Sequence, residues 1–343
     1  MKVLITGAAG FIGSQLAHRF WMNGEELVLA DNFSYGRREN LVFPDHDFNE
    51  DIICMDIRDR NGIKQLFEKG GIDYVYNIAG IAPLPDCQLS PQEAADVNLT
   101  GFINILENAR IYGAEKIIQA STNAIYENAD SFPVKEDSFA LPSLIYPNTK
   151  YAAERFAQSY CDTYGMSVTC LRFSNVYGPH TDCLRKQPPF MAYMIRELYY
   201  DRVPVFHSTG EQRRDYIYVD DLAELAVSVR NTGGFDAVNA SSGRNYSVNE
   251  LYEMAQKIMG KDIRAVYAQD AHYWEQYPGL YQGKFPVKQS ILNHEINKYT
   301  LCDNSYAKEK YGWSPRVTME EGMRIMIKEE TGFLQMMDRG GRL

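Results

Sequence analysis

The sequence predicts an α/β protein, a doubly wound parallel sheet followed by a smaller mixed α/β lobe. Short apolar runs alternate with longer amphipathic segments over the first 175 residues or so, which is the pattern of repeated strand–helix–strand units. The alternation weakens after that point, where the chain becomes rich in Pro, Tyr and Met. At 343 residues the chain is about twice the length of a typical domain, so we expect one large or two small units.

The first part is expected to contain parallel strands joined by crossover helices, because each apolar run is separated from the next by a segment long enough for a crossover. The predicted strands are Lys2–Thr6, Glu26–Ala30, Asp51–Cys54, Tyr74–Ile78, Lys116–Ala120 and Ser167–Arg172. The predicted helices lie near Phe11–Asn23, Gly62–Glu68, Pro91–Tyr112 and Tyr146–Tyr164.

Three later segments are expected to return to this sheet: a strand at Tyr216–Val219, a helix at Asp220–Arg230 and a strand at Val238–Ala240. The predicted first domain therefore comprises residues 1–175 plus 215–240. The second lobe comprises residues 176–214 plus 241–343 and includes a helix at Val248–Ile258.

Composition excludes several classes of protein. Apolar residues make up 45% and charged residues 23%, as in ordinary globular proteins, which argues against disorder and fibrous structure. The net charge of −10 argues against nucleic-acid and anionic-membrane partners. No apolar stretch approaches the roughly 20 residues that span a bilayer, and Lys2 leads directly into a strand, so we expect a cytoplasmic protein. The six cysteines are scattered without ligand spacing, so we expect reduced thiols and no metal site.

A glycine-rich turn follows the first strand and opens the first helix. Gly7, Gly10 and Gly13 are spaced G-x-x-G-x-x-G, with Phe11 and Ile12 between the second and third. Glycines at these points permit a tight turn, a close approach of the backbone to a pyrophosphate and close helix packing, and the helix N-terminus favours the phosphate charge. The turn predicts a Rossmann-type fold that binds a dinucleotide at these five residues.

The next two strands end in polar residues that suit such a ligand. Asp31 and Asn32 follow the second strand, where a carboxylate accepts ribose hydroxyls and repels a 2′-phosphate, so NAD is predicted rather than NADP. Arg37 and Arg38 would suit the extra phosphate, although a solvated loop explains them better while Asp31 is present. Asp56 and Ile57, after the third strand, are placed to border the adenine.

Tyr146 and Lys150 lie one helical turn apart on one face of a predicted helix. A free phenol has a pKa of about 10, and lowering it toward 7 needs roughly 4 kcal/mol of preferential stabilisation of the phenolate. A neighbouring ammonium and a positively charged nicotinamide ring would both act in that direction. Ser121 and Thr122 precede the pair at a strand end, downstream of the glycine turn, and this order argues against a chance match of the Tyr/Lys pair.

With these motifs the chain resembles an extended short-chain dehydrogenase/reductase of the NAD-dependent epimerase/dehydratase family, in particular its nucleoside-diphosphate-sugar 4-epimerases. The resemblance covers nearly the whole chain. Besides the residues above it rests on Ala79-Gly80, Asn98, Ser121, the Arg172–Pro179 segment, the Arg214–Asp221 segment and Tyr311–Pro315.

The resemblance implies a role for each matching residue. Tyr146 would be the acid/base, Lys150 would hold the nicotinamide ribose, and Thr122 would hydrogen-bond the reacting oxygen. Two further groups follow from the resemblance: Ala79 and Gly80 on the cofactor, and Ala82, Asn123, Asn175, Phe206 and Arg214 on the substrate. Within the second group, Asn175 and Arg214 would grip the diphosphate and Phe206 would pack on the base. A turn-capping role for Asn175 and core packing for Phe206 are competing explanations.

The resulting hypothesis is an NAD-dependent enzyme that epimerises a nucleoside-diphosphate sugar at C4 through a transient 4-keto intermediate. Asn123 and Ala124 stand where dehydratases of the family carry Asp and Glu, which disfavours a 4,6-dehydratase. A net 4-dehydrogenase or 4-ketoreductase would use the same residues and remains an alternative, as does a non-catalytic protein that senses NAD. In the family, the helices predicted at Pro91–Tyr112 and Tyr146–Tyr164 pair with their copies, which implies a homodimer.

Overall fold

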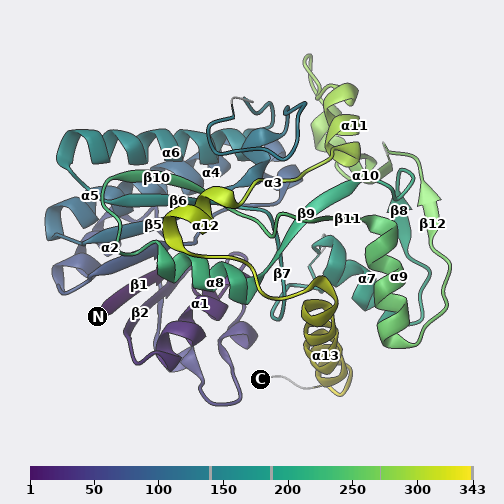
Figure 1. Ribbon diagram of the computed structural model, residues 1–343, viewed down its shortest axis with the longest axis horizontal. Helices are drawn as coiled ribbons and strands as arrows, with labels where there is room; N and C mark the ends of the chain where they lie inside the picture. The colour runs from purple at the N-terminus through teal and green to yellow at the C-terminus, as the bar shows by residue number, and fades with distance from the viewer. Residues whose placement is uncertain (139–140, 186–187, 271, 341–343) are drawn as a thin grey trace.

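The structure, a computed structural model, describes residues 1–138, 141–185, 188–270 and 272–340, and seven strands within these ranges form its central sheet (Figure 1). All neighbouring strands are parallel, which confirms the predicted fold class. In spatial order the strands are β10 (Phe235–Ala240), β6 (Val168–Phe173), β5 (Lys116–Thr122), β4 (Tyr74–Asn77), β1 (Lys2–Thr6), β2 (Glu26–Asp31) and β3 (Ile52–Cys54).

The chain changes direction across the sheet between β1 and β4, which are paired with Thr6 beside Asn77. In a doubly wound sheet the crevice outside the carboxyl ends of two such strands is where ligands bind. The loops that follow β1 and β4 contain the glycine turn and Ala79-Gly80. The topology thus brings two predicted cofactor segments together.

Helices cover both faces of the sheet. One face carries α1 (Phe11–Met22), α8 (Val219–Ser228) and α12 (Ser305–Tyr311), which share a core with β1 and β10. The other carries α2 (Arg60–Glu68), α5 (Phe102–Tyr112) and α6 (Ile145–Tyr164). These layers bury both faces of the sheet, which explains the continuous aliphatic run Val-Leu-Ile in the middle of β1.

Two sequence predictions differ from the structure. The strand predicted at Tyr216–Val219 is β9 (Arg213–Tyr218), and it does not join the central sheet but pairs with β7 (Asn175–Tyr177) and β11 (Asn245–Ser247). The helix predicted over Pro91–Tyr112 is interrupted.

The interruption is a π-helical turn at Asp96–Gly101, between α4 (Pro91–Ala95) and α5. Asn98 in this turn bonds both the main-chain N–H and the carbonyl of Ile81. Its side chain therefore holds the loop after β4, and such π turns are frequent at functional sites.

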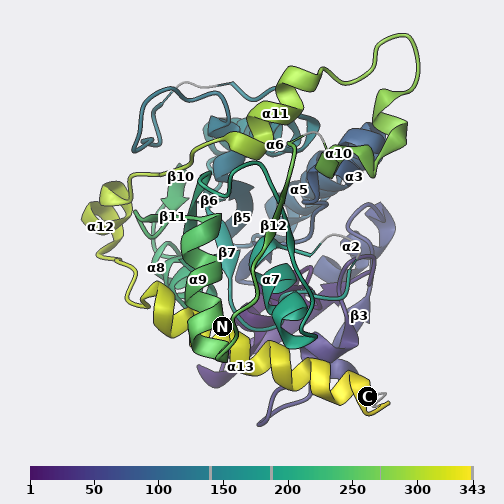
Figure 2. The same ribbon diagram turned by 90° about the vertical axis from the view of Figure 1, so that its right-hand side faces the viewer.

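The second lobe is built on the β7–β9–β11 sheet and the parallel pair β8 (Val205–His207) and β12 (Val266–Ala268). Its core is closed by three helices: α7 (Phe190–Tyr199), α9 (Val248–Met259) and α13 (Met319–Asp338). Figure 2 shows α13, drawn in yellow, crossing beneath α9 and α7.

The segment between β12 and α12 extends from the second lobe back over the first. It contains α10 (His272–Glu275), a 3-10 turn at Pro278–Tyr281 and α11 (Gln289–Asn297). Its small core includes Trp274 and Leu292 and packs on Leu84 of α3 (Leu84–Leu89), the helix after β4. Within the described ranges, no helix has the length and apolar character needed to cross a membrane.

Candidate active site

The glycine turn forms a cradle that side chains would fill. Gly7 has a φ of +70°, and a Cβ there would lie 2.7 Å from the Ala79 nitrogen. A Cβ on Gly13 would lie 2.0 Å from the Gly7 oxygen, so helix α1 packs directly on the turn. Gly10 is the N-cap of α1 and brings no side-chain cap to it. The first main-chain N–H groups of α1 are therefore suited to an anion.

Phe11 and Ile12, between the second and third glycines, anchor the glycine turn by packing against neighbouring cores. Phe11 packs against the core of the second lobe, and Ile12 packs against the core beneath the sheet. Both are partly buried. The start of α1 is thus fixed by both parts of the molecule.

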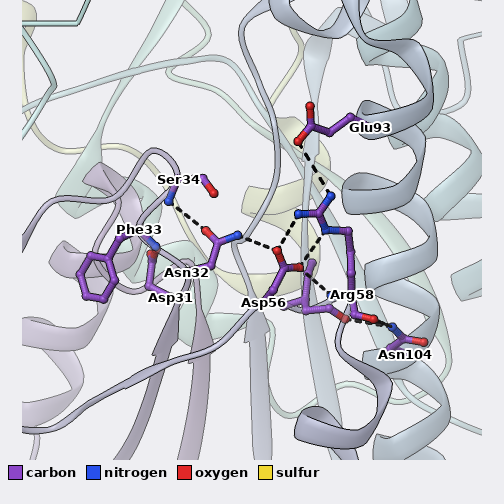
Figure 3. Close-up of polar contacts among 9 residues, drawn as sticks. Asp31, Asn32, Phe33, Ser34, Asp56, Arg58, Glu93 and Asn104 are labelled. Atoms are coloured by element: carbon purple, nitrogen blue, oxygen red, sulfur yellow. Dashed lines mark hydrogen bonds and ion pairs between the residues drawn. The ribbon is translucent and has the colours of Figure 1, made fainter.

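Asp31, at the end of β2, ties its own loop to the glycine turn. Its Oδ2 accepts the N–H of Ala9 at 2.9 Å. Its Oδ1 accepts the N–H of Phe33 at 2.7 Å, and Figure 3 draws Asp31 and Phe33. The side chain is buried, which raises the pKa of Asp31, while these N–H groups oppose the rise. Asn32 donates to Asp56 at 2.8 Å and so joins the loops after β2 and β3.

Asp56 is held by an arginine that sequence reasoning missed. Arg58 donates to both carboxylate oxygens, at 3.0 and 2.7 Å, and reaches Glu93 at 3.8 Å. The guanidinium lowers the pKa of Asp56 to about 2. Ile57 beside it is buried under Gly101, where a Cβ would lie 2.6 Å from the Ile57 side chain. Arg58 is only two positions after Asp56 in the sequence, and this proximity of opposite charges is the signal that could have predicted the ion pair.

Lys150 approaches the loop after β4. A Cβ on Gly80 would lie 3.0 Å from the Lys150 ammonium and 2.9 Å from the Asn98 carboxamide oxygen, so only glycine leaves room for these groups. Ala79 precedes it on the rim of the glycine turn. The ammonium donates to the Ala120 carbonyl at 3.1 Å, and burial lowers the pKa of Lys150 to about 8.

Tyr146 and Thr122 lie together at the end of β5. Burial raises the pKa of Tyr146 to about 12, a hydrogen bond with the Thr122 side chain acts in the opposite direction, and the nearby Cys87 raises it slightly further. The Thr122 oxygen also accepts the Ala124 N–H at 3.1 Å. Because that bond uses the oxygen, the hydroxyl proton is available to the phenol.

A buried network that the sequence did not reveal stands behind these residues. Glu154 makes a two-point ion pair with Arg172 at 3.0 and 2.7 Å and accepts the Ser121 hydroxyl at 2.5 Å. Glu154 lies one helical turn after Lys150 on α6. Lys150 and Glu154 on one face of α6 thus bond to Ala120 and Ser121, two successive residues of β5. These bonds fix the position of α6 along β5, and with it the position of Tyr146 relative to Thr122.

The predicted substrate residues fall into two groups. Ala82 is exposed, and the Asn123 carboxamide nitrogen is buried without a hydrogen-bond partner among the described residues. A buried donor of this kind is costly unless a ligand satisfies it. Asn175 is exposed, but its carboxamide donates to the Asp215 carbonyl at 2.8 Å, which supports the structural explanation of that residue.

Arg214 and Phe206 already have protein partners. The Arg214 guanidinium donates to the Glu295 carbonyl at 2.6 Å, to the Ile296 carbonyl at 3.1 Å and to the Lys298 carbonyl, so it caps the C-terminal end of α11. Phe206 is 3% exposed and stands edge-on to the rings of neighbouring core residues. The structure thus places Arg214 on the C-terminal end of α11 and Phe206 in the core of the second lobe.

Fold and site together define an α/β enzyme that binds a dinucleotide at the switch point of a parallel sheet and carries a Tyr/Lys pair beside it. The NAD dependent epimerase/dehydratase family model matches residues 3–240, and the chain belongs to this family. NAD is accordingly its cofactor. The cradle at Gly7 and Gly13 and the carboxylate of Asp31 fit that dinucleotide.

Individual relatives cover nearly the whole chain. UDP-glucuronate 4-epimerase of Thermodesulfobacterium geofontis is 28% identical over 337 residues, 94% of each chain. The solved UDP-glucose 4-epimerase of Thermotoga maritima with UDP-glucose is 30% identical, with a TM-score of 0.85 over 97% of this chain and 100% of that one. The Thermus thermophilus UDP-glucose 4-epimerase complex with NAD is 26% identical, with a TM-score of 0.81 over 97% and 99%.

Proposed function

We propose that this protein is an NAD-dependent epimerase that inverts C4 of a nucleoside-diphosphate sugar through a transient 4-keto intermediate. The observation that carries the proposal is the arrangement of Tyr146 and Thr122 next to the buried Lys150, whose ammonium lies against Gly80 and the Ala120 carbonyl. The relatives named for UDP-sugar 4-epimerisation support a uridine nucleotide as the first substrate to test.

The phenol of Tyr146 would take the proton of the sugar hydroxyl and later return it. Bringing its pKa from about 12 toward neutrality takes roughly 7 kcal/mol of preferential stabilisation of the phenolate. Lys150, whose pKa of about 8 keeps it an ammonium at pH 7, would supply part of this from one helical turn away. Thr122 supplies another part by donating its hydroxyl proton to the phenolate.

When bound, NAD would supply the hydride acceptor that oxidation and re-reduction of the sugar carbon require. Gly7, Gly10 and Asp31 would hold the cofactor. The chain must also let the ketosugar turn between the two transfers, so its contacts with the hexose must be weaker than those with the diphosphate. The free amide donor of Asn123 would orient the hexose beside Thr122.

The residues after Thr122 argue against water elimination. Asn123 and Ala124 carry an amide and a methyl group, and neither can transfer a proton as the acid and base of a dehydratase must. The proposed reaction needs only one acid/base, Tyr146.

The first experiment is to denature the purified protein, identify any released dinucleotide and nucleotide sugar by mass spectrometry, and incubate native enzyme with UDP-, GDP-, CDP- and dTDP-sugars without added cofactor. We expect an isomeric product with no net change in NAD redox state. A product lighter by two hydrogens, with stoichiometric NADH, would instead establish a dehydrogenase.

A variant tests the mechanism separately. Tyr146→Phe removes the acid/base and should lower turnover by at least about a hundredfold while NAD is retained. Near-normal turnover would remove Tyr146 from the reaction.

We also propose a cytoplasmic homodimer. All six cysteines of the described chain carry free thiols, which fits a reducing compartment. Apolar side chains stand exposed on α5 and α6: Ile111 at 55%, Phe156 at 42% and Tyr164 at 55%. A second copy would bury this surface by pairing the two helices with their counterparts.

A further inference from the structure

The helix that carries Tyr146 begins without a cap of its own. Its N-cap residue, Leu144, offers no side-chain hydrogen bond. The carboxylate of Glu127 takes this place from 17 residues earlier, since its Oε1 accepts the N–H of Leu144 at 2.9 Å and that of Ser143. A carboxylate at a helix N-terminus is favoured both by these bonds and by the helix dipole. The N-cap of α6, two residues before Tyr146, is therefore fixed by Glu127.

The same residue is bonded to α11. The Glu127 carbonyl lies 2.7 Å from the Nε2 atom of His294, and because a carbonyl only accepts, Nε2 carries the hydrogen. Glu127 is 7% exposed, and its second carboxylate oxygen is buried without a partner among the described residues. The cavity between these elements measures only ≈ 10 Å³, about one water, so α11 and the start of α6 are closely packed.

Helix α11 is also the helix that Arg214 caps. Three α11-end carbonyls, those of Glu295, Ile296 and Lys298, accept from the Arg214 guanidinium. A guanidinium has five N–H donors, so it can hold this helix end and still offer hydrogen bonds to a phosphate. A ligand there would share the guanidinium with α11.

We propose that Glu127 is a positioning residue that couples the diphosphate end of the substrate to the catalytic tyrosine. The path runs from Arg214 through α11 to His294, from His294 to the main chain of Glu127, and from the Glu127 carboxylate to the start of α6. Ligand at Arg214 steadies α11, and the steadied α11 holds Glu127 and thus the backbone that places Tyr146. The inference rests on the proposed function, because it assumes that a nucleoside diphosphate binds at Arg214.

Hydrogen exchange of the full-length, NAD-loaded protein with and without UDP tests this path. In the wild type, UDP should slow exchange about fivefold both in residues 289–298 and in residues 143–150. His294→Ala breaks the link without touching the cap. It should leave exchange of 143–150 unchanged in the absence of UDP and abolish the response of that segment to UDP, while 289–298 still responds.

Variants of Glu127 provide the second arm. Glu127→Ala should lose the response of 143–150 and lower kcat about tenfold or more with KM for the sugar nucleotide within about threefold. Glu127→Gln retains an oxygen that accepts both N–H groups and should restore both properties. Thr318→Ala is the matched control, because it removes the N-cap bond of α13, away from the site, and should leave the UDP response intact.

The outcomes separate the two proposals. If UDP protects both segments equally in the wild type, His294→Ala and Glu127→Ala, the coupling is overturned and the proposed function stands. If UDP protects neither segment of the wild type, the diphosphate site at Arg214 is wrong, and the coupling falls with it.

Discussion

Replacing Thr122 by Val removes the hydrogen bond that acts on the Tyr146 phenol. The side chain keeps its branched shape but loses both the hydrogen bond that lowers the pKa of Tyr146 and the acceptor that the Ala124 N–H reaches at 3.1 Å. A hydrogen bond to a charged group contributes about 1.5–3 kcal/mol, so its loss should raise the pKa of the phenol by about 1–2 units.

The sign of the effect follows from the titration. In the proposed mechanism the active base is the Tyr146 phenolate, and its fraction rises with pH until pH exceeds the pKa. A higher pKa therefore moves the rising limb of the kcat profile about 1–2 pH units toward alkali and lowers kcat about 10–100-fold at a fixed pH below it. The assay is the pH dependence of turnover of the NDP-sugar identified in the panel, with bound NAD measured in parallel.

Thr122→Ser is the control, because its hydroxyl retains both bonds. It should keep the wild-type profile within about threefold in kcat. The reasoning is refuted if Thr122→Val has the wild-type profile, or if the serine variant shifts it equally.

Three further predictions concern stability and assembly. Burial lowers the pKa of Lys150 to about 8, so its charge destabilises the fold fully below pH 8, and this destabilisation is lost as pH rises from 8 to 10.5. Lys150→Met should therefore raise the free energy of unfolding of the cofactor-free protein at pH 7 by about 2 kcal/mol in urea. A lower free energy of unfolding would contradict this prediction. Burial raises the pKa of Glu330 on α13 to about 7, so its ionisation destabilises the fold progressively from about pH 4.5 to pH 7. The stability gain of Glu330→Gln over wild type should therefore be roughly 2 kcal/mol larger at pH 8 than at pH 5.5, and equal gains at both pH values would oppose this. Phe156→Glu should convert a dimer to a monomer in sedimentation velocity, and a monomeric wild type would exclude the interface.

Much of the sheet could be predicted because its strands are buried on both faces. β1, for example, is a run of aliphatic residues between a charged start and a glycine turn, and its bounds match the prediction, Lys2–Thr6. The sheet to which β9 belongs could not be predicted in the same way. An apolar run such as Tyr216–Tyr218 does not say which strand it will pair with, and its partners β7 and β11 have only three residues each.

The cofactor side of the site was accessible to sequence reasoning because its chemistry is local. Gly7 and Gly13 lie six residues apart, and their spacing alone specifies the close contact that the structure contains. The partners of Arg214 are main-chain carbonyls 81 to 84 residues away. Carbonyls belong to every residue, so no side-chain pattern marks which of them an arginine will reach.

The partners of individual cations explain how a chain with a net charge of −10 can take an anionic ligand such as NAD. Arg58 and Arg172 each face a carboxylate, Asp56 and Glu154, which neutralises them and gives them structural roles. Lys150 and Arg214 instead donate to main-chain carbonyls, which satisfy their N–H groups but leave the full positive charge in place.

A buried cation solvated by dipoles is costly to the folded protein, and burial lowers the pKa of both Lys150 and Arg214 accordingly. In the proposed function, an anion bound beside Lys150 or Arg214 would relieve that cost, so the fold would prepare part of its binding energy. The net negative charge of the chain would act against anions that cannot reach these two residues, which would confine the attraction to their surroundings.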